Sequence, residues 1–408
     1  MSSIPGAYTV AHLPEGELAW EIPLKDCASR PEDIGFITQP TTKNNNVFLC
    51  LSGEVICFES ETGNVVFARD LGAHKNELAA CYPCDGAIIV VRGDATIWKL
   101  SLTDGSTIWS TKTLNERYVH GNTQSYNEDG TATTTPLYAD ASWYITHVIT
   151  HKDLVITGFS SYSVDPGSHL TCLNLIDGNI CWDIAFPGRF TFQGGVAQPL
   201  ATSHGVLVPA PEEPALTLLS YADGSECARI ELDAPIGLPI TPYPDQPNRA
   251  IVQTMTGALY EIEFGENSLS IIHTLESDIS YQEAPPTQAG ACIAGMQALC
   301  NAPSTTGTSC ARIYLETLEI EEPYVSGTLQ QTPVLLQDEE GAVAIYAFIN
   351  NTLNKAPITP EGISPFEKLT SFDSLVIPDT AVPLTIDAEG RIFLLSDSGT
   401  DATLVALH

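Results

Sequence analysis

The chain repeats one pattern of turn residues and short apolar runs along its whole length. In each copy a proline begins the first apolar run and three further runs follow. A Gly turn often precedes the last run, which often carries an aromatic residue four positions after the glycine. The prolines lie 43 to 63 residues apart and are Pro40, Pro83, Pro136, Pro199, Pro242, Pro286, Pro333 and Pro383. Four strand-like runs per copy, at a period of about 40 to 50 residues, are typical of a β-propeller.

The clearest copy begins at Pro83. Runs rich in β-branched and aromatic residues occupy 88–92, 95–102 and 106–111, and turn signals at Gly93-Asp94 and Asp104-Gly105 separate them. Such runs between Gly and Asp turns predict antiparallel strands joined as hairpins. The copies that begin at Pro286 and Pro333 lack the Gly-x-x-x-Trp mark, although strand-like runs remain at 292–296, 311–318 and 342–349.

The two ends of the chain complement each other. Residues 383–408 contain three strands of a copy, and residues 16–24 contain an isolated fourth strand in which Gly16 and Trp20 match Gly105 and Trp109. Pairing the two ends would close a ring and leave no sheet edge at the join. We therefore predict an all-β fold: one domain, residues 1–408, forming an eight-bladed β-propeller of four-stranded blades. A β-sandwich or two unrelated β domains would not explain the complementary ends.

The repeat resembles that of the quinoprotein-like propeller superfamily over residues 16 to 408. The matching residues are Pro83, Ile97, Trp98, Leu100, Gly105 and Trp109, and likewise Pro40, Gly53, Val55, Phe58, Gly63 and Phe67. The resemblance implies the fold but says little about activity, because one fold hosts many functions. Quinone-dependent dehydrogenases of this superfamily place adjacent cysteines beneath the cofactor, and this chain has no Cys-Cys pair. We therefore predict no cofactor.

Composition narrows the choice of partners. Asp and Glu number 50 against 17 Lys and Arg, which gives a formal net charge of −33. Nucleic acids and anionic membrane surfaces need cationic contacts, so neither is expected as a partner. No apolar stretch is long enough to span a membrane. The first 15 residues lack the basic and apolar segments of a signal peptide. The compartment stays open: secreted or endomembrane if a signal has been removed, otherwise cytoplasmic. The oligomeric state also stays open.

Eleven cysteines are many for a cytosolic chain of this size. Cys81 and Cys84 have the spacing of a zinc half-site, but no second half-site accompanies them, so no metal site is predicted. Cys292, Cys300 and Cys310 flank a polar segment, 297–309, which we expect to be a loop. A disulfide could hold that loop in an oxidising compartment, whereas scattered buried thiols are the alternative.

Candidate site residues lie in the loops that precede the prolines, because these loops are expected to surround the central channel. The 114–135 loop carries Tyr118 and His120, and the 187–198 loop carries Arg189, Phe190 and Phe192. A ring of neutral polar side chains would come from Gln39, Tyr82, Gln198, Gln282, Gln331 and Thr332. Each of these residues could instead satisfy backbone groups at the ends of strands.

Two functions are compatible with such a set of loops around the central channel. The acidic, Lys-poor chain resembles fungal hetero-Diels–Alderases of tropolone sesquiterpenoid biosynthesis. That resemblance implies a cofactor-free enzyme that joins a hydrophobic terpene to a tropolone quinone methide, with His120, Tyr118 or Arg189 assisting catalysis. The chain also resembles the outer-membrane assembly propeller lipoprotein of bacteria, which implies a non-catalytic scaffold that binds peptide strands. A deep pocket with aromatic walls would favour the enzyme, and a filled channel with a patch on its rim would favour the scaffold.

Overall fold

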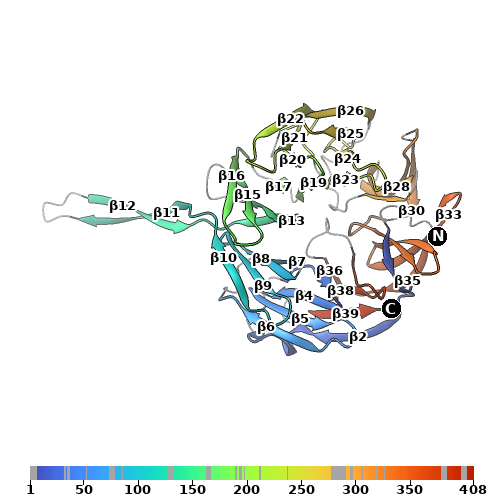
Figure 1. The fold of residues 1–408 in the computed structure, drawn as a ribbon, viewed down its shortest axis with the longest axis horizontal. Coiled ribbons are helices and arrows are strands. Elements are labelled where there is room, and N and C mark those ends of the chain that lie inside the picture. The colour runs from blue at the N-terminus through green and yellow to red at the C-terminus, as the bar shows by residue number, and fades with distance from the viewer. Residues whose placement is uncertain are drawn as a thin grey trace.

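The computed structural model describes most of the chain. The described residues are 7–408 apart from 32–33, 35–36, 52, 73–78, 85, 127–131, 162–166, 189–190, 193–194, 197, 211–212, 237, 277–290, 295–296, 305–306, 318, 326, 378–383 and 397–401. Figure 1 shows blades arranged in a ring. The described strands form eight blades, each with four antiparallel strands that follow one another from the centre of the ring to its rim. Within the described part the one helix is the short 3₁₀ turn η1 (Leu24–Asp26). The predicted eight-bladed propeller is therefore confirmed.

Each blade contributes four strands, which follow one another from the centre outward. Blade 1 is β3 (Thr41–Lys43), β4 (Asn46–Leu51), β5 (Glu54–Glu59) and β6 (Val65–Asp70). Blade 2 is β7 (Ala79–Cys84), β8 (Ala87–Arg92), β9 (Thr96–Ser101) and β10 (Thr107–Lys112). Blade 3 is β13 (Tyr144–His151), β14 (Leu154–Ser160), β15 (Ser168–Asn174) and β16 (Ile180–Phe186). Blade 4 is β19 (Leu200–Ala201), β20 (Val206–Pro209), β21 (Ala215–Leu219) and β22 (Glu226–Glu231).

The second half of the chain forms the other four blades. Blade 5 is β23 (Thr241–Pro242), β24 (Arg249–Gln253), β25 (Leu259–Gly265) and β26 (Ser268–Leu275). Blade 6 is β27 (Cys292–Ala294), β28 (Gln297–Ser304), β29 (Gly307–Tyr314) and β30 (Glu319–Val325). Blade 7 is β31 (Val334–Asp338), β32 (Val343–Ile349), β33 (Thr352–Thr359) and β35 (Glu367–Ser371), with the short β34 (Gly362–Ile363) against β33. Blade 8 is β37 (Thr385–Ile386), β38 (Ile392–Ser396), β39 (Thr403–Leu407) and β2 (Leu18–Pro23), with β36 (Leu375–Val376) also against β38.

The ring closes as the sequence predicts. β2 pairs antiparallel with β39, from Leu18 opposite Leu407 to Pro23 opposite Thr403. Figure 1 shows this join as a blue strand beside a red one. A further strand, β1 (Tyr8–Val10), was not predicted. It pairs parallel with β31 and so adds a fifth main strand to the inner side of blade 7.

Most of the described prolines mark the innermost strands. Pro40, Pro199 and Pro333 come directly before β3, β19 and β31, and Pro83 and Pro242 lie within β7 and β23. Pro286 and Pro383 lie outside the described residues.

The prediction for Pro136 is wrong. This proline lies in β12 (Ala132–Asp140), which pairs with β11 (Arg117–Tyr126), and the innermost strand of blade 3 begins only at Tyr144. Residues 114–135 were expected to be a loop at the channel, but most of them belong to this two-stranded hairpin. It projects outward from the ring in Figure 1. We call the hairpin, residues 117–126 and 132–140, the arm.

The predicted loop at 297–309 is also wrong, because most of these residues form the β28 and β29 strands. All eleven cysteines of the chain are thiols, so no disulfide joins Cys292, Cys300 and Cys310. Cys300 lies opposite Ala311 and Cys310 lies opposite Asn301, so the strand register does not place these two cysteines face to face.

The hydrophobic core lies between neighbouring blades. One cluster joins Phe48 and Cys57 of blade 1 to Ile88 and Leu100 of blade 2, and all four side chains are fully buried. A close aromatic contact accompanies such clusters in part of the ring. A Cβ atom placed on Gly178, in the turn before β16, would lie 2.7 Å from the ring of Trp109 in β10. Because Gly178 also has φ +74, glycine is required there for both reasons.

The same contact recurs in four consecutive blade interfaces. The aromatic residues of the outer strands are Trp20, Phe67, Trp109 and Trp182, and the glycines of the next blades are Gly63, Gly105, Gly178 and Gly224. In three of the interfaces the indole Nε1 also donates a hydrogen bond to a carbonyl oxygen of the next blade, at 3.0 to 3.1 Å. Blades 8, 1, 2, 3 and 4 are thus joined by one repeated contact.

A β-bulge places these aromatic residues. In β10 the register skips Ile108, and Trp109 follows directly. The same irregularity precedes Trp20, Phe67 and Trp182. A bulge increases local twist and interrupts the outer edge of the strand, which protects it from pairing with another chain.

Candidate functional site

Five of the six residues predicted to form the polar ring lie in or just before an innermost strand. Gln331 and Thr332 are buried just before β31, Gln39 is buried just before β3, and Gln198 and Tyr82 are half-buried. The amide oxygen of Gln39 is buried without a partner among the described atoms. Gln282 lies outside the described residues. A binding role for these side chains stays a prediction.

Two of the three predicted catalytic residues lie on the arm, and the third lies outside the described residues. Tyr118 and His120 lie on β11, and the arm that carries them projects away from the ring (Figure 1). Arg189 and Phe190 lie outside the described residues, and Phe192 ends the short strand β17 (Thr191–Phe192), which pairs with β18 (Gly195–Val196). Their catalytic role stays a prediction that the fold does not test.

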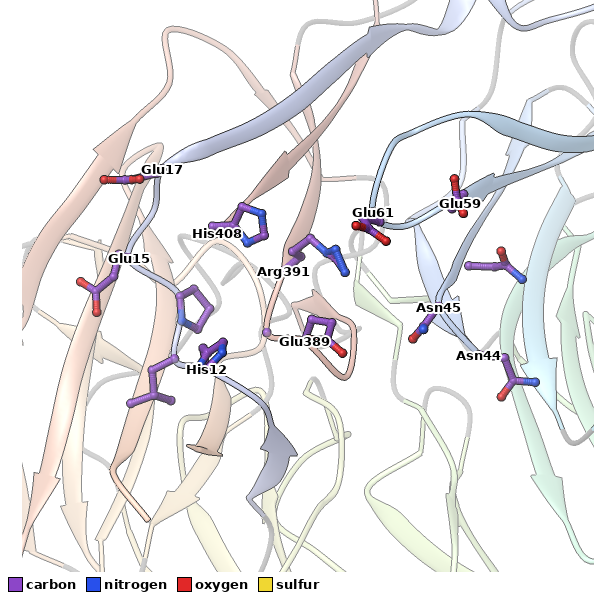
Figure 2. Close-up of a pocket in the computed structure, with 14 residues that line it drawn as sticks. His12, Glu15, Glu17, Asn44, Asn45, Glu59, Glu61, Glu389, Arg391 and His408 are labelled. Atoms are coloured by element: carbon purple, nitrogen blue, oxygen red, sulfur yellow. The ribbon is translucent and has the colours of Figure 1, made fainter. Parts of the chain in front are cut away.

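The structure shows instead a cavity of about 930 Å³ beside the ring closure. We call it the seam cavity. Its charged and polar lining residues are Glu15, Glu17, Glu59, Glu61, Glu389, Asn44, Asn45, Asn46, His12, His408 and Arg391. Figure 2 shows Glu15 and Glu17 on one side and Glu59, Glu61, Asn44 and Asn45 on the other, with Arg391 and Glu389 between them.

Strand topology explains where the seam cavity lies. Successive strands of a blade are antiparallel, so the turns after the first and third strands share one end of the blade. The connections between blades leave from the opposite end. Asn44-Asn45 and Glu59–Glu61 belong to the β3–β4 and β5–β6 turns of blade 1, and Glu389 belongs to the β37–β38 turn of blade 8. The seam cavity therefore lies on the face opposite the loops in which the site was predicted.

Local conformation brings the walls of the seam cavity together. Asn44 and Asn45 both have positive φ, 52 and 59, which Asn tolerates better than most residues and which suits a tight two-residue hairpin. The N-terminal segment is fixed because the amides of Glu15 and Glu17 donate to the carbonyl oxygen of His408, at 2.9 and 3.0 Å. The Trp20 indole donates to the carbonyl oxygen of Ser60, so the repeated aromatic contact holds the turn that carries Glu59 and Glu61.

One buried ion pair forms the floor of the seam cavity. Arg391 Nε donates to Asp387 Oδ2 at 3.0 Å, and both side chains are almost fully buried. The backbone amides of Glu389 and Arg391 also donate to Asp387 Oδ1. Arg391 is therefore already neutralised. Glu15 pairs with Lys355 at 2.8 Å, which leaves the carboxylates of Glu17, Glu59, Glu61 and Glu389 to set the charge of the seam cavity.

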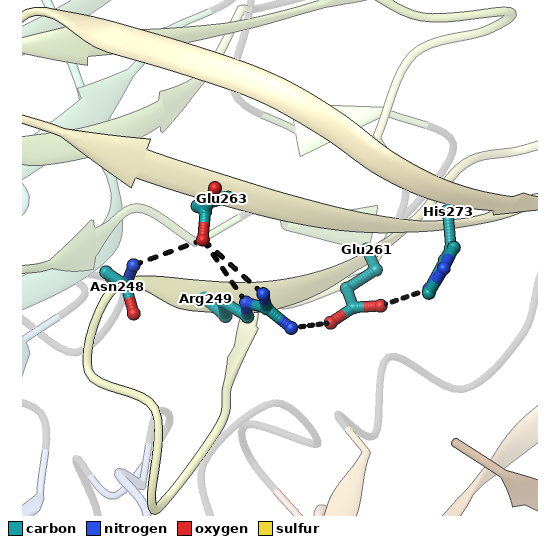
Figure 3. Close-up of polar contacts among 5 residues, drawn as sticks. All are labelled: Asn248, Arg249, Glu261, Glu263 and His273. Atoms are coloured by element: carbon teal, nitrogen blue, oxygen red, sulfur yellow. Dashed lines mark hydrogen bonds and ion pairs between the residues drawn. The ribbon is translucent and has the colours of Figure 1, made fainter. Parts of the chain in front are cut away.

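A second polar cluster lies in blade 5 (Figure 3). The buried Glu261 accepts from Arg249 at 3.2 Å and contacts His273 Nδ1 at 2.7 Å. Glu263 lies near Arg249 and Asn248, at 3.4 Å from each. His273 follows the bulge of β26, the position that Trp109 holds in β10. Because Arg249 and His273 both contact Glu261, this cluster links three strands of one blade.

Metal binding receives no support from the described residues. Among them, no group of three or more His, Cys, Asp or Glu side chains is close enough to hold a metal ion. No helix in the part of the chain that the structure covers is long and apolar enough to cross a membrane.

Sequence reasoning missed the seam cavity because its walls come from four distant segments and the chain end. The available signal was the predicted pairing of residues 16–24 with 383–408. That pairing brings Glu15, Glu17 and His408 together and places them next to the turns of blade 1.

Comparisons with known proteins agree with the fold. A family model described as outer membrane protein assembly factor BamB matches residues 8–185, which is less than half of the 408 residues. The matched segment ends just after Trp182, the last aromatic residue of the repeated contact. Comparison with curated proteins found no match to the chain.

Three solved structures share the architecture. BamB from Moraxella catarrhalis is 13% identical with a TM-score of 0.58, and the alignment covers 96% of this chain and 97% of that one. Quinohemoprotein alcohol dehydrogenase from Comamonas testosteroni is 10% identical with a TM-score of 0.62, covering 98% and 78%. The C-terminal WD40 domain of Sif2 is 10% identical with a TM-score of 0.60, covering 98% and 99%. At these identities the likeness to the solved structures extends to the fold alone, and the chain is similar in sequence to the BamB family over residues 8–185.

Proposed function

We propose that this protein is a binding scaffold whose seam cavity takes an extended, positively charged segment of a partner protein. The observation that carries the proposal is the seam cavity itself, about 930 Å³ in volume and lined by five glutamates and one arginine that is already paired. Lys and Arg side chains of a partner could pair with carboxylates on both walls of the seam cavity.

Electrostatics supports a cationic partner over other ligands. The chain carries a net charge of −33, so its field attracts cationic segments before contact and repels anionic ones. Charge complementarity of this kind raises the association rate and makes binding depend on salt. The amides of Asn44, Asn45 and Asn46 add donors and acceptors that can bind the backbone of an extended segment.

The similarity to a family described as an assembly factor adds support for a protein partner. The hetero-Diels–Alderase hypothesis has less support. It needs a hydrophobic pocket with aromatic walls, whereas the seam cavity is acidic and its aromatic rings are the imidazoles of His12 and His408. The residues expected to catalyse that reaction include Tyr118 and His120, which lie on the outward arm.

The test measures binding of a short fluorescent Lys-rich peptide by anisotropy, beside a Glu-rich peptide of the same length. Replacing Glu59 and Glu61 by Gln removes two charges from one wall of the seam cavity. We expect affinity for the Lys-rich peptide to fall about fivefold, since each exposed charge pair contributes up to about 1 kcal/mol. Affinity should also fall with added salt.

The control replaces Glu316 and Glu319 by Gln. These exposed residues lie at the corresponding β29–β30 turn of blade 6, so the change in net charge and the place of the turn within the blade are the same. This variant should bind the Lys-rich peptide as the unmodified protein does. Equal losses in both variants would reduce the proposal to a non-specific charge effect, and no binding of the Lys-rich peptide by the unmodified protein would overturn it.

A further inference from the structure

The arm differs from every blade in having two strands. β11 and β12 pair with each other in a separate two-stranded sheet, and the sheet topology of the described residues gives neither of them another partner strand. Side chains on both faces of the arm are exposed, among them Asn122, Thr123, Thr134 and Thr135. The arm therefore packs neither face against the ring over these residues.

The two ends of the arm are joined at its base, and an ion pair links that base to blade 3. The amide of Ala141 donates to the carbonyl oxygen of Glu116 at 2.9 Å, and Arg117 pairs with Asp140 at 3.2 Å. His169 of β15 lies between Asp183 and Glu116, at 2.9 and 3.2 Å. A fixed base holds the arm pointing outward, but an isolated two-stranded hairpin is marginally stable in water and gains from a third strand.

The two free edges of the arm are not equivalent. Pro136 lies within β12, opposite Asn122, and a ladder tolerates proline where its nitrogen points away from the partner strand. The free edge of β12 therefore lacks a donor near its centre. In an antiparallel ladder, two directly opposed residues point their backbone groups either both toward each other or both away. Because the nitrogen of Pro136 points away from β11, the backbone N–H of Asn122 points away from β12. The free edge of β11 therefore keeps outward donors at alternate residues, among them Asn122 and Tyr126.

Beyond its base the arm lacks the protection found on the outer strands of the blades, since the bulge of β11 lies at His120 and the charged residue of β11, Arg117, lies at the base. The outer strands of the blades carry bulges and charged residues, such as Lys112 on β10 and Glu226 on β22. Residues 121–126 and 132–137 contain no Asp, Glu, Lys or Arg, in a chain whose net charge is −33. Natural edge strands that must stay unpaired are normally blunted by charges, proline or bulges. The β11 edge from Gly121 to Tyr126 therefore lacks these protections.

We propose that β11 pairs antiparallel with β11 of a second copy of this chain, joining two arms into one four-stranded sheet. Identical edges are self-complementary under a twofold axis, which is the commonest symmetry of soluble dimers. The ten residues of β11 span roughly 34 Å. Arms of this length hold two acidic rings apart by more than the Debye length, about 8 Å at physiological salt, so repulsion between the rings is screened. This pairing does not depend on the seam cavity.

Sedimentation equilibrium over a concentration series tests the pairing, with proline as the probe. Asn122→Pro removes an outward donor from the β11 edge and leaves the ladder to β12 intact, and Gly121 before it tolerates a following proline. Thr134→Pro is the matched control, because it removes an outward donor from the β12 edge that Pro136 already interrupts. We expect the unmodified protein and Thr134→Pro to dimerise with the same constant, and Asn122→Pro to weaken dimerisation at least tenfold.

Small-angle scattering adds a second readout, since arm-to-arm pairing predicts an elongated dimer with two separated rings. Circular dichroism and the thermal midpoint check that the ring of each variant is intact, because both substitutions lie outside it. The proposal is overturned if the unmodified protein has the mass of a monomer at every concentration, as it would if the arm bound a different partner. It is also overturned if Asn122→Pro dimerises normally or if both variants lose the dimer equally.

Discussion

The two halves of the ring solve the same packing problem with different chemistry. Between blades 8 and 4 an aromatic residue after each bulge packs on a glycine of the next blade, as Trp109 does on Gly178. In blade 5 the residue after the bulge is His273, which contacts Glu261 of its own blade. In blade 6 Arg312 donates to the carbonyl oxygen of Ile363 in blade 7, at 3.0 Å, and pairs with Glu321.

The difference shows that the bulge and the aromatic residue are separable parts of the repeat. The bulge persists in β22 and β26, where Cys227 and Ile272 are skipped, although no tryptophan follows it there. An apolar ring buried on glycine is insensitive to salt, whereas a charged network is screened by it. The seam cavity belongs to the aromatic half, since Trp20 fixes one of its walls.

The largest effect is expected for Trp182→Ala. Trp182 is 7% exposed, packs on Gly224 and donates to the carbonyl oxygen of Tyr221. Truncation of a buried tryptophan costs about 3 to 5 kcal/mol of unfolding free energy. His273→Ala changes the equivalent position of blade 5, where the side chain is mostly exposed, and should cost less than about 1 kcal/mol. Urea denaturation measures both losses, and similar values would erase the proposed distinction between the halves.

Gly178→Ala should cost about 2 to 3 kcal/mol. Part of that cost comes from φ +74, which is unfavourable for alanine, and the rest comes from overlap of the new Cβ with the Trp109 ring. Gly86→Ala isolates the first part, because Gly86 has φ +72 and open space where a Cβ would lie. If denaturation gives the same loss for both glycines, the contact with Trp109 does not stabilise the ring.

Glu261→Gln should cost about 1 kcal/mol, because it removes a charge that Arg249 and His273 share and keeps most of the hydrogen bonding. This loss should shrink in part when the melts are repeated in 1 M salt, because salt screens the more exposed Arg249 and His273 better than the buried Glu261. The loss for Trp182→Ala should stay the same in both conditions. A loss at Glu261 that salt leaves unchanged would contradict the electrostatic explanation for blade 5.

The smallest effect is a pH dependence from His169, a titratable group of blade 3 in the aromatic half. Burial lowers the pKa of His169, but Asp183 and Glu116 outweigh burial, so the pKa is raised from its ordinary value. A raised pKa in the folded state adds stability that is complete below the ordinary value, about 6.5, and is lost as pH rises through the raised value. The thermal midpoint of the unmodified protein should therefore exceed that of His169→Gln by more at pH 6 than at pH 8. A gap that widens toward pH 8 would reverse the assigned sign.

The blades could be predicted because their signals are local. Residues 88–92, 95–102 and 106–111 form β8, β9 and β10 within one or two residues of the predicted limits, since turn residues bound each run. Gly16 and Trp20 identified the closing strand because they repeat a spacing found elsewhere in the chain.

The arm and the seam cavity could not be predicted in the same way. A ribbon that is exposed on both faces has no alternation of apolar and polar residues, so its Thr-rich strands look like a loop in the sequence. The wide spacing around Pro136 was the available signal of an insertion. The seam cavity has no local pattern at all, because Glu15, Glu59 and Glu389 become neighbours only when the ring closes.

Hydrogen exchange measured by mass spectrometry, with and without the Lys-rich peptide, tests most directly the claim that the seam cavity is the binding site. The account predicts slower exchange in the presence of the peptide at residues 12–17, 44–46, 59–61 and 389–391, which contribute to the walls and floor of the seam cavity. Exchange at the corresponding turn of blade 6, residues 315–319, should not change. Slowing spread evenly around the acidic surface, or confined to the loops between blades on the opposite face, would contradict it.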